Sequence, residues 1–154
     1  MKSFRLLYKY VLCLSAVLCL SAFTLRAQEG LQISTLFDKF GNRQNVTMVE
    51  LNGNILKSYK MTKYKSLVFK DVTPYLTEIQ KCLKHDREQS GQVSKTQEVV
   101  EDGVLRSAYY QLQELKGEQR YILFKMGKKA TATLVYIEGS LNEEELMNML
   151  YKEQ

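Results

Sequence analysis

The stretch that most limits how this chain can fold is an uncharged run near the C-terminus, residues 130–137. In an extended strand, successive side chains point to opposite faces. One face would carry Ala130, Ala132, Leu134 and Tyr136, and the other would carry Thr131, Thr133, Val135 and Ile137. Because neither face carries a charge, the pattern predicts a strand at the centre of a sheet, with protein on both sides.

Turn signals predict that the rest of the sheet is built from hairpins. Asn52-Gly53 and Asp102-Gly103 are dipeptides that tolerate the positive φ angles of tight hairpin turns, and residues 126–129 separate two further β-rich runs. The expected strands are residues 46–51, 55–59, 64–70, 96–100, 104–112, 121–125 and 131–138. Hairpins join antiparallel neighbours, so the sheet should be mainly antiparallel.

Three amphipathic segments predict helices. The first covers residues 31–40, with Gly41 as its left-handed stop, and the second runs from Pro74 to about residue 88. The third follows Gly139, where Ser140 and Glu143 suggest a capping box before a stripe of Leu146, Met149 and Leu150. The order α-β-β-β-α-β-β-β-β-α predicts an α+β domain with its helices packed on one face of the sheet.

The N-terminus has the layout of a cleavable secretory signal, residues 1–27. A basic start precedes an uncharged apolar run over residues 11–25, and the small residue Ala27 follows. The run is about 15 residues long, whereas a membrane-spanning helix needs about 20. A retained anchor and a lipoprotein remain alternatives, although leucines rather than small residues precede Cys13 and Cys19. Residues 28–154 would then form a single α+β domain without a stable membrane span.

Charge and cysteine content narrow the function classes. The formal net charge is +5, but four basic residues precede the expected cut, so the remaining chain is nearly neutral and nucleic acid is not an expected partner. Cys82 would be the single cysteine left, which excludes an intramolecular disulfide.

Several segments resemble a family of small exported proteins of unknown function from Bacteroides-type bacteria. The segments are residues 28–33, 45–47, 64–67, 70–71, 121–125 and 132–139. The resemblance implies one α+β domain in a Gram-negative envelope. The expected location is the periplasm, with outer-membrane association or secretion as alternatives. The family carries no known activity, so no functional residue is transferred from it.

Cys82 and His85 are three residues apart on one predicted helix, a spacing that could form a nucleophile or half of a metal site. Cys82 also belongs to the apolar stripe, where a free cysteine packs as a small hydrophobe. His85 is the single histidine, and a zinc site needs more ligands. No catalytic, cofactor-binding or metal-ligating residues are therefore predicted, and no cofactor is expected.

Two surface features are candidates for binding. The basic stretch from Lys57 to Lys70 could contact anionic glycan or lipid headgroups, or could simply blunt an edge strand against aggregation. Its candidate contacts are Lys57, Lys60, Lys63 and Lys65. Glu143, Glu144 and Glu145 lie where carboxylates favour the start of a helix, so capping explains them better than a cation site.

The leading functional hypothesis is a non-enzymatic envelope protein that binds a partner protein, or itself, through the less covered face of the sheet. The candidate contacts are Thr131, Thr133, Val135 and Tyr136. The alternatives are weak anion binding through the lysines and a small hydrolase that uses carboxylates.

Overall fold

The computed structural model describes residues 30–89 and 91–152, so the expected signal at residues 1–27 lies outside the described part. The chain divides into two compact units, Met1–Leu31 and Gln32–Gln154. The second unit contains all the described helices and strands and is described here by itself.

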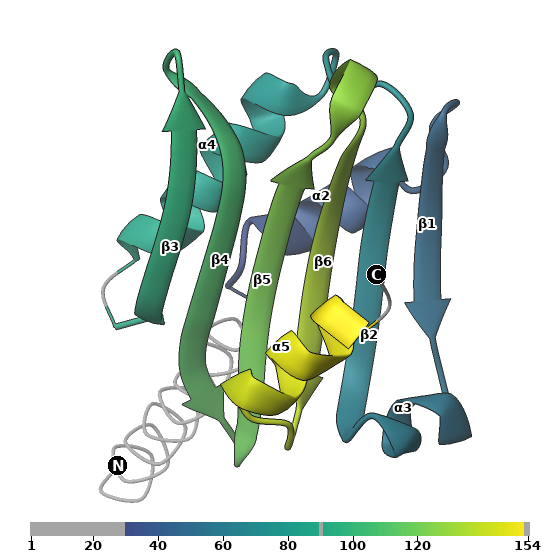
Figure 1. Cartoon of the computed structure of the whole chain (residues 1–154), viewed down its shortest axis with the longest axis vertical. Helices are drawn as coiled ribbons and strands as arrows, with labels where there is room; N and C mark the ends of the chain where they lie inside the picture. The colour runs from purple at the N-terminus through teal and green to yellow at the C-terminus, as the bar shows by residue number, and fades with distance from the viewer. Residues whose placement is uncertain (1–29, 90, 153–154) are drawn as a thin grey trace, which may run out of the picture. The chain divides into compact units, whose positions relative to one another are not determined.

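The second unit is built on a six-stranded sheet with the order β1-β2-β6-β5-β4-β3, in which every neighbouring pair is antiparallel (Figure 1). The strands are β1 (Val46–Leu51), β2 (Met61–Phe69), β3 (Val93–Glu101), β4 (Val104–Leu115), β5 (Glu118–Met126) and β6 (Ala132–Gly139). The predicted central strand is confirmed, because β6 lies between β2 and β5.

The helices lie on both sides of this sheet. α2 (Ile33–Phe40) and α4 (Leu76–Glu88) cover one face, whereas α5 (Glu143–Lys152) crosses part of the other (Figure 1). The α+β class with an antiparallel sheet is confirmed. Packing on one face holds for α2 and α4 but not for α5, because the uncharged second face of β6 also has to be covered.

One expected hairpin is replaced by a short helix. Residues 55–59 were expected as a strand, but the chain forms α3 (Asn54–Ser58), and β1 pairs instead with β2. Gly53 turns the chain out of β1 with φ of +72°, and Leu56 of α3 is buried. A helical turn brings that single leucine onto the core, which the exposed Ile55 and Tyr59 do not require.

Other turns follow the expected chemistry, with two exceptions. Asp102 and Gly103 join β3 to β4 with positive φ, as predicted, and Lys116-Gly117 makes an unpredicted hairpin of the same kind. Gly41 is not left-handed, because its φ is −57°. A Cβ there would lie 2.6 Å from the Phe37 carbonyl oxygen and 2.7 Å from the Met48 Sδ, so close approach explains this glycine.

The core between the sheet and α2/α4 contains a buried carboxylate that fixes a helix end. The Asp86 side chain on α4 is fully buried and accepts hydrogen bonds from the backbone N–H groups of Gln32, at 2.7 Å, and Ile33, at 3.0 Å. Burial raises the pKa of Asp86, and the two N–H donors act in the opposite direction. Asp86 therefore takes the place of a local N-cap for α2.

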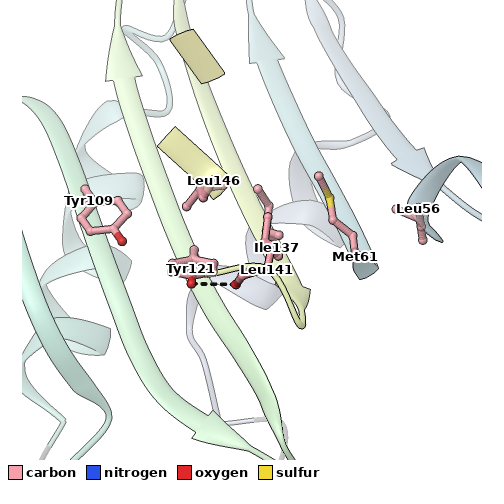
Figure 2. Close-up of a cluster of buried hydrophobic side chains, with 7 residues drawn as sticks. All are labelled: Leu56, Met61, Tyr109, Tyr121, Ile137, Leu141 and Leu146. Atoms are coloured by element: carbon pink, nitrogen blue, oxygen red, sulfur yellow. Dashed lines mark hydrogen bonds between the residues drawn. The ribbon is translucent and has the colours of Figure 1, made fainter. Parts of the chain in front are cut away.

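The core under α5 is a separate apolar cluster (Figure 2). Its buried residues are Leu56, Met61, Tyr109, Tyr121, Ile137, Leu141 and Leu146. The Tyr121 hydroxyl donates a hydrogen bond to the Leu141 carbonyl oxygen at 3.0 Å, which ties the segment before α5 to the sheet. Both cores use β6, so this strand is packed on each side.

The start of α5 is capped two residues later than expected. The Asn142 side chain accepts from the Glu145 backbone N–H at 2.9 Å, and the Glu145 carboxylate accepts from the Asn142 N–H at 2.8 Å. Ser140 does not cap the helix, because its own N–H donates to the Lys60 carbonyl oxygen at 2.9 Å. The reciprocal pair is a capping box moved into register with α5.

Replacing Leu146 with alanine should destabilise the protein by about 2–5 kcal/mol, because Leu146 is the fully buried residue of α5. Leu150→Ala is the matched control and should cost about half as much, since Leu150 is only partly buried. Urea unfolding of both variants measures the difference. Equal losses would contradict the view that Leu146 anchors the helix.

Candidate functional site

The face of the sheet that carries α5 is only partly covered. The 10 residues of α5 extend about 15 Å, whereas six strands about 4.8 Å apart span about 24 Å. α5 therefore crosses one half of the sheet and leaves the other half without a helix, as Figure 1 shows.

The uncovered part, here called the open half-sheet, consists of two rows of side chains. Strand register aligns one residue from each strand in the outer row: Thr47, Val68, Thr133, Lys125, Ser107 and Val99. The inner row, beside α5, contributes the partly buried residues Val49, Val135 and Leu123.

The open half-sheet combines apolar character with a flat shape. Val68 is 41% exposed and Val99 is 50% exposed, while Val135 and Leu123 are half-buried against the cluster under α5. Met147 and Leu150 of α5 are also partly buried and border the inner row. Scattered exposed valines are ordinary, but a contiguous apolar area bordered by a helix is a feature of interaction surfaces.

The structure divides the predicted interaction residues between different places. Thr133 and Val135 lie on the open half-sheet. Thr131 is exposed just before β6, where its hydroxyl donates to the Lys128 carbonyl oxygen at 2.9 Å. Tyr136 is buried on the opposite face and donates to the Glu138 carboxylate at 2.6 Å, so it cannot share a surface with Thr133. Burial raises the pKa of Tyr136.

Sequence reasoning missed Val68 and Val99, the two exposed valines of the open half-sheet. Val68 lies in a Leu67-Val68-Phe69 run, whose neighbours are fully buried. Three consecutive apolar residues do not reveal which one faces outward. Register with Thr133 on β6 was the available signal, since the partners of an outward-facing residue share its face.

The four candidate lysines do not form one anion-binding patch. Lys60 pairs with Glu145, Lys63 with Glu138 at 3.7 Å, and Lys65 with Glu50 at 3.7 Å. Lys57 is exposed on α3. Lys63 and Lys65 align with Glu138 and Tyr136 on the helix-covered side, away from Lys60. Because three of the four charges already have an acidic neighbour, their field on a distant anion is reduced.

A hollow of about 370 Å³ lies between the end of α3 and α5. It is lined by Ser58, Tyr59, Lys60, Leu141, Glu145, Asn148, Met149 and Lys152. Its two central charges, Lys60 and Glu145, pair with each other, and Glu145 also caps α5. The hollow therefore belongs to the attachment of α5 to the sheet.

Cys82 and His85 do not form a reactive pair. Cys82 is 9% exposed, and burial raises the pKa of its thiol, which favours the unreactive protonated form. His85 is turned toward Asp86, with 3.6 Å between Nδ1 and the carboxylate. Among residues 30–89 and 91–152, no group of three or more His, Cys, Asp or Glu side chains could hold a metal ion.

The three glutamates at the start of α5 have different surroundings. Glu143 pairs with Lys95 on β3 at 2.6 Å, and Glu145 pairs with Lys60. Glu144 is exposed and, within the described part of the chain, has no ion-pair partner. Two of the glutamates therefore anchor α5 to the strands, whereas Glu144 faces away from the sheet.

Polar groups buried near α4 hold the edge of the sheet. Arg87 donates to the Glu98 carboxylate at 2.7 Å, and the Tyr110 hydroxyl donates to the same carboxylate. These bonds join α4 to β3 and β4 and rigidify the sheet behind the open half-sheet. On the other face, burial and the neighbouring Glu143 raise the pKa of Tyr109, whose hydroxyl has no hydrogen-bond partner among the described residues.

The fold and this surface define a small α+β protein with one partly covered sheet face. The family whose description reads "Family of unknown function (DUF6108)" matches residues 20–150, so the chain belongs to that family. No curated protein matches the chain. No solved structure matches it either. Within the described residues, none of the helices is both long enough and apolar enough to span a membrane.

Cys82 should be nearly inert in the folded protein, because it is buried and its thiol pKa is raised. A thiol reagent at mildly alkaline pH should label it at least about tenfold more slowly in the native protein than in denaturant. Cys82→Ser should cost about 1 kcal/mol or more, since a hydroxyl is buried without a designed partner. Rapid native labelling with unchanged stability would contradict the core assignment.

Proposed function

We propose that this protein is an exported, non-enzymatic component of the bacterial envelope that binds another protein through the open half-sheet. The observation that carries the proposal is the row of β-branched side chains that α5 leaves uncovered, with Val68 and Val99 as its most exposed apolar members. The N-terminal layout of a basic start, an apolar run and Ala27 supports export.

The open half-sheet suits a protein partner better than a small molecule. It is flat rather than concave, and its outer row has a single charged residue, Lys125. Small ligands favour concave sites that surround most of their surface. A partner protein can instead cover Val68, Thr133 and Val99 together, which buries contiguous apolar area across several strands.

The arrangement behind the surface favours binding because it is already ordered. Valine and threonine have few accessible rotamers, so they lose little conformational entropy when a partner covers them. The strands below them are held by α2 and α4 on the other face, through Asp86 and the Arg87–Glu98 pair. A preformed surface of this kind needs little rearrangement on binding.

A photo-crosslinking residue placed at Thr133 in the native host should form a covalent adduct with the partner protein. Thr77 is the matched control, because it is an exposed threonine on α4, on the helix-covered side of the sheet. We expect an adduct from position 133 and none from position 77, measured by mass spectrometry after denaturing purification. Adducts from position 77 alone would contradict the assignment of the binding face.

Export has its own test. The protein isolated from the envelope of its host should begin at Gln28, because Ala27 supplies the small residue before the cut. Intact mass and N-terminal sequencing measure this. A chain that keeps Arg26, or that carries acyl groups on Cys19, would contradict cleavage after Ala27 and favour an anchor or a lipoprotein.

A further inference from the structure

We propose that the partner of the open half-sheet is a second copy of this chain, whose α5 packs onto it in a two-fold symmetric dimer. This inference rests on the proposed function and names the partner of the same surface. Its basis is a stepped face, since α5 raises one half of the sheet surface and leaves the other half low (Figure 1).

A stepped face of this kind is complementary to itself. When two copies face each other across a two-fold axis that runs along the step, the raised half of each lies over the low half of the other. Such an isologous contact uses the same patch twice and closes on itself. The raised part of each copy is the outward side of α5, and the low part is the open half-sheet.

The outward side of α5 carries the side chains that such a contact needs. Glu144, Asn148 and Tyr151 are spaced i, i+4 and i+7, so they share one side of the helix, and all three are exposed. Tyr151 is 68% exposed, more than any other large apolar side chain of the described residues. Exposed tyrosines of this kind are common anchors of protein interfaces.

The charges on the two halves are opposite and both unpaired. Lys125 on the open half-sheet has no ion-pair partner within the described chain, and neither does Glu144 on α5. Their neighbours Glu143 and Glu145 are each already paired with a lysine. A dimer would therefore join Glu144 of each copy to Lys125 of the other, and symmetry makes this contact twice.

The positions along α5 agree with this pairing. A two-fold axis parallel to α5 keeps each residue of the partner at the same height along the helix. The beginning of α5 lies toward β4 and β5, where Lys125 is, and its end lies toward β2, where Val68 is (Figure 1). The partner's Glu144 thus comes over Lys125, and its Tyr151 comes over Val68.

The size of the contact predicts a weak, reversible dimer. Two rows of side chains about 7 Å apart along strands that span about 24 Å cover roughly 300 Å², and the outer side of α5 adds roughly 150 Å². The pair would bury on the order of 900 Å² in total, which is the size of a transient interface with a Kd on the order of 10 µM.

Charge exchange tests the dimer directly in sedimentation velocity experiments on the naturally processed chain. Lys125→Glu and Glu144→Lys should each weaken the dimer by about tenfold, because each creates two like-charge contacts. The double variant should recover to within about threefold of the wild type, since both contacts are restored with reversed signs. Lys84→Glu on α4 is the charge-matched control and should leave the association unchanged.

Three outcomes would overturn the dimer. These are a wild-type chain that stays monomeric at every concentration, single exchanges without effect, and a double variant that is weaker than either single variant. The crosslinker at Thr133 separates this inference from the proposed function. An adduct of twice the chain's mass supports the dimer. An adduct with a different protein, from a monomeric chain, keeps the proposed function and refutes the second copy.

Discussion

The length of α5 determines how this molecule presents itself to a partner. A helix of this length cannot cross a six-stranded sheet, so one face is buried completely by α2 and α4 while the other is buried only in part. Leu146 fills the covered half together with Tyr121 and Ile137. The apolar side chains beyond the helix edge remain in contact with solvent, and this partial cover gives the protein its most distinctive surface.

The fully covered face makes the partly covered one rigid. Asp86 holds the start of α2, and the Arg87–Glu98–Tyr110 group holds α4 against the edge of the sheet. Both sets of contacts lie on the side away from the open half-sheet, so they are not lost when a partner binds there. The fold therefore separates the residues that maintain the structure from those available for recognition.

The sequence predicts the elements that strong local patterns specify. Apolar spacing in Ile33–Phe40, the Asp102-Gly103 turn and the two uncharged faces of β6 each correspond to the structure. Residues 55–59 were misassigned because Asn52-Gly53 is a strong hairpin signal in isolation, while the burial of Leu56 depends on a core formed much later in the chain. Tertiary contacts decided that segment.

The candidate surface was predictable only in part. Alternation along β6 predicts that Thr133 and Val135 share a face, and the structure agrees. Which face remains uncovered depends on where α5 lies, and a single sequence does not contain that information. The same limit explains why Tyr136 was grouped with Thr133, although its place in the alternation puts it on the buried side.

Methyl NMR tests most directly whether the open half-sheet is the binding surface. Leu67 and Val68, and likewise Leu134 and Val135, are sequence neighbours whose side chains lie on opposite faces of the sheet. As protein or partner concentration rises, the methyl signals of Val68 and Val135 should shift while those of Leu67 and Leu134 stay in place. Shifts confined to Leu67 and Leu134, or to residues of α4, would contradict the account.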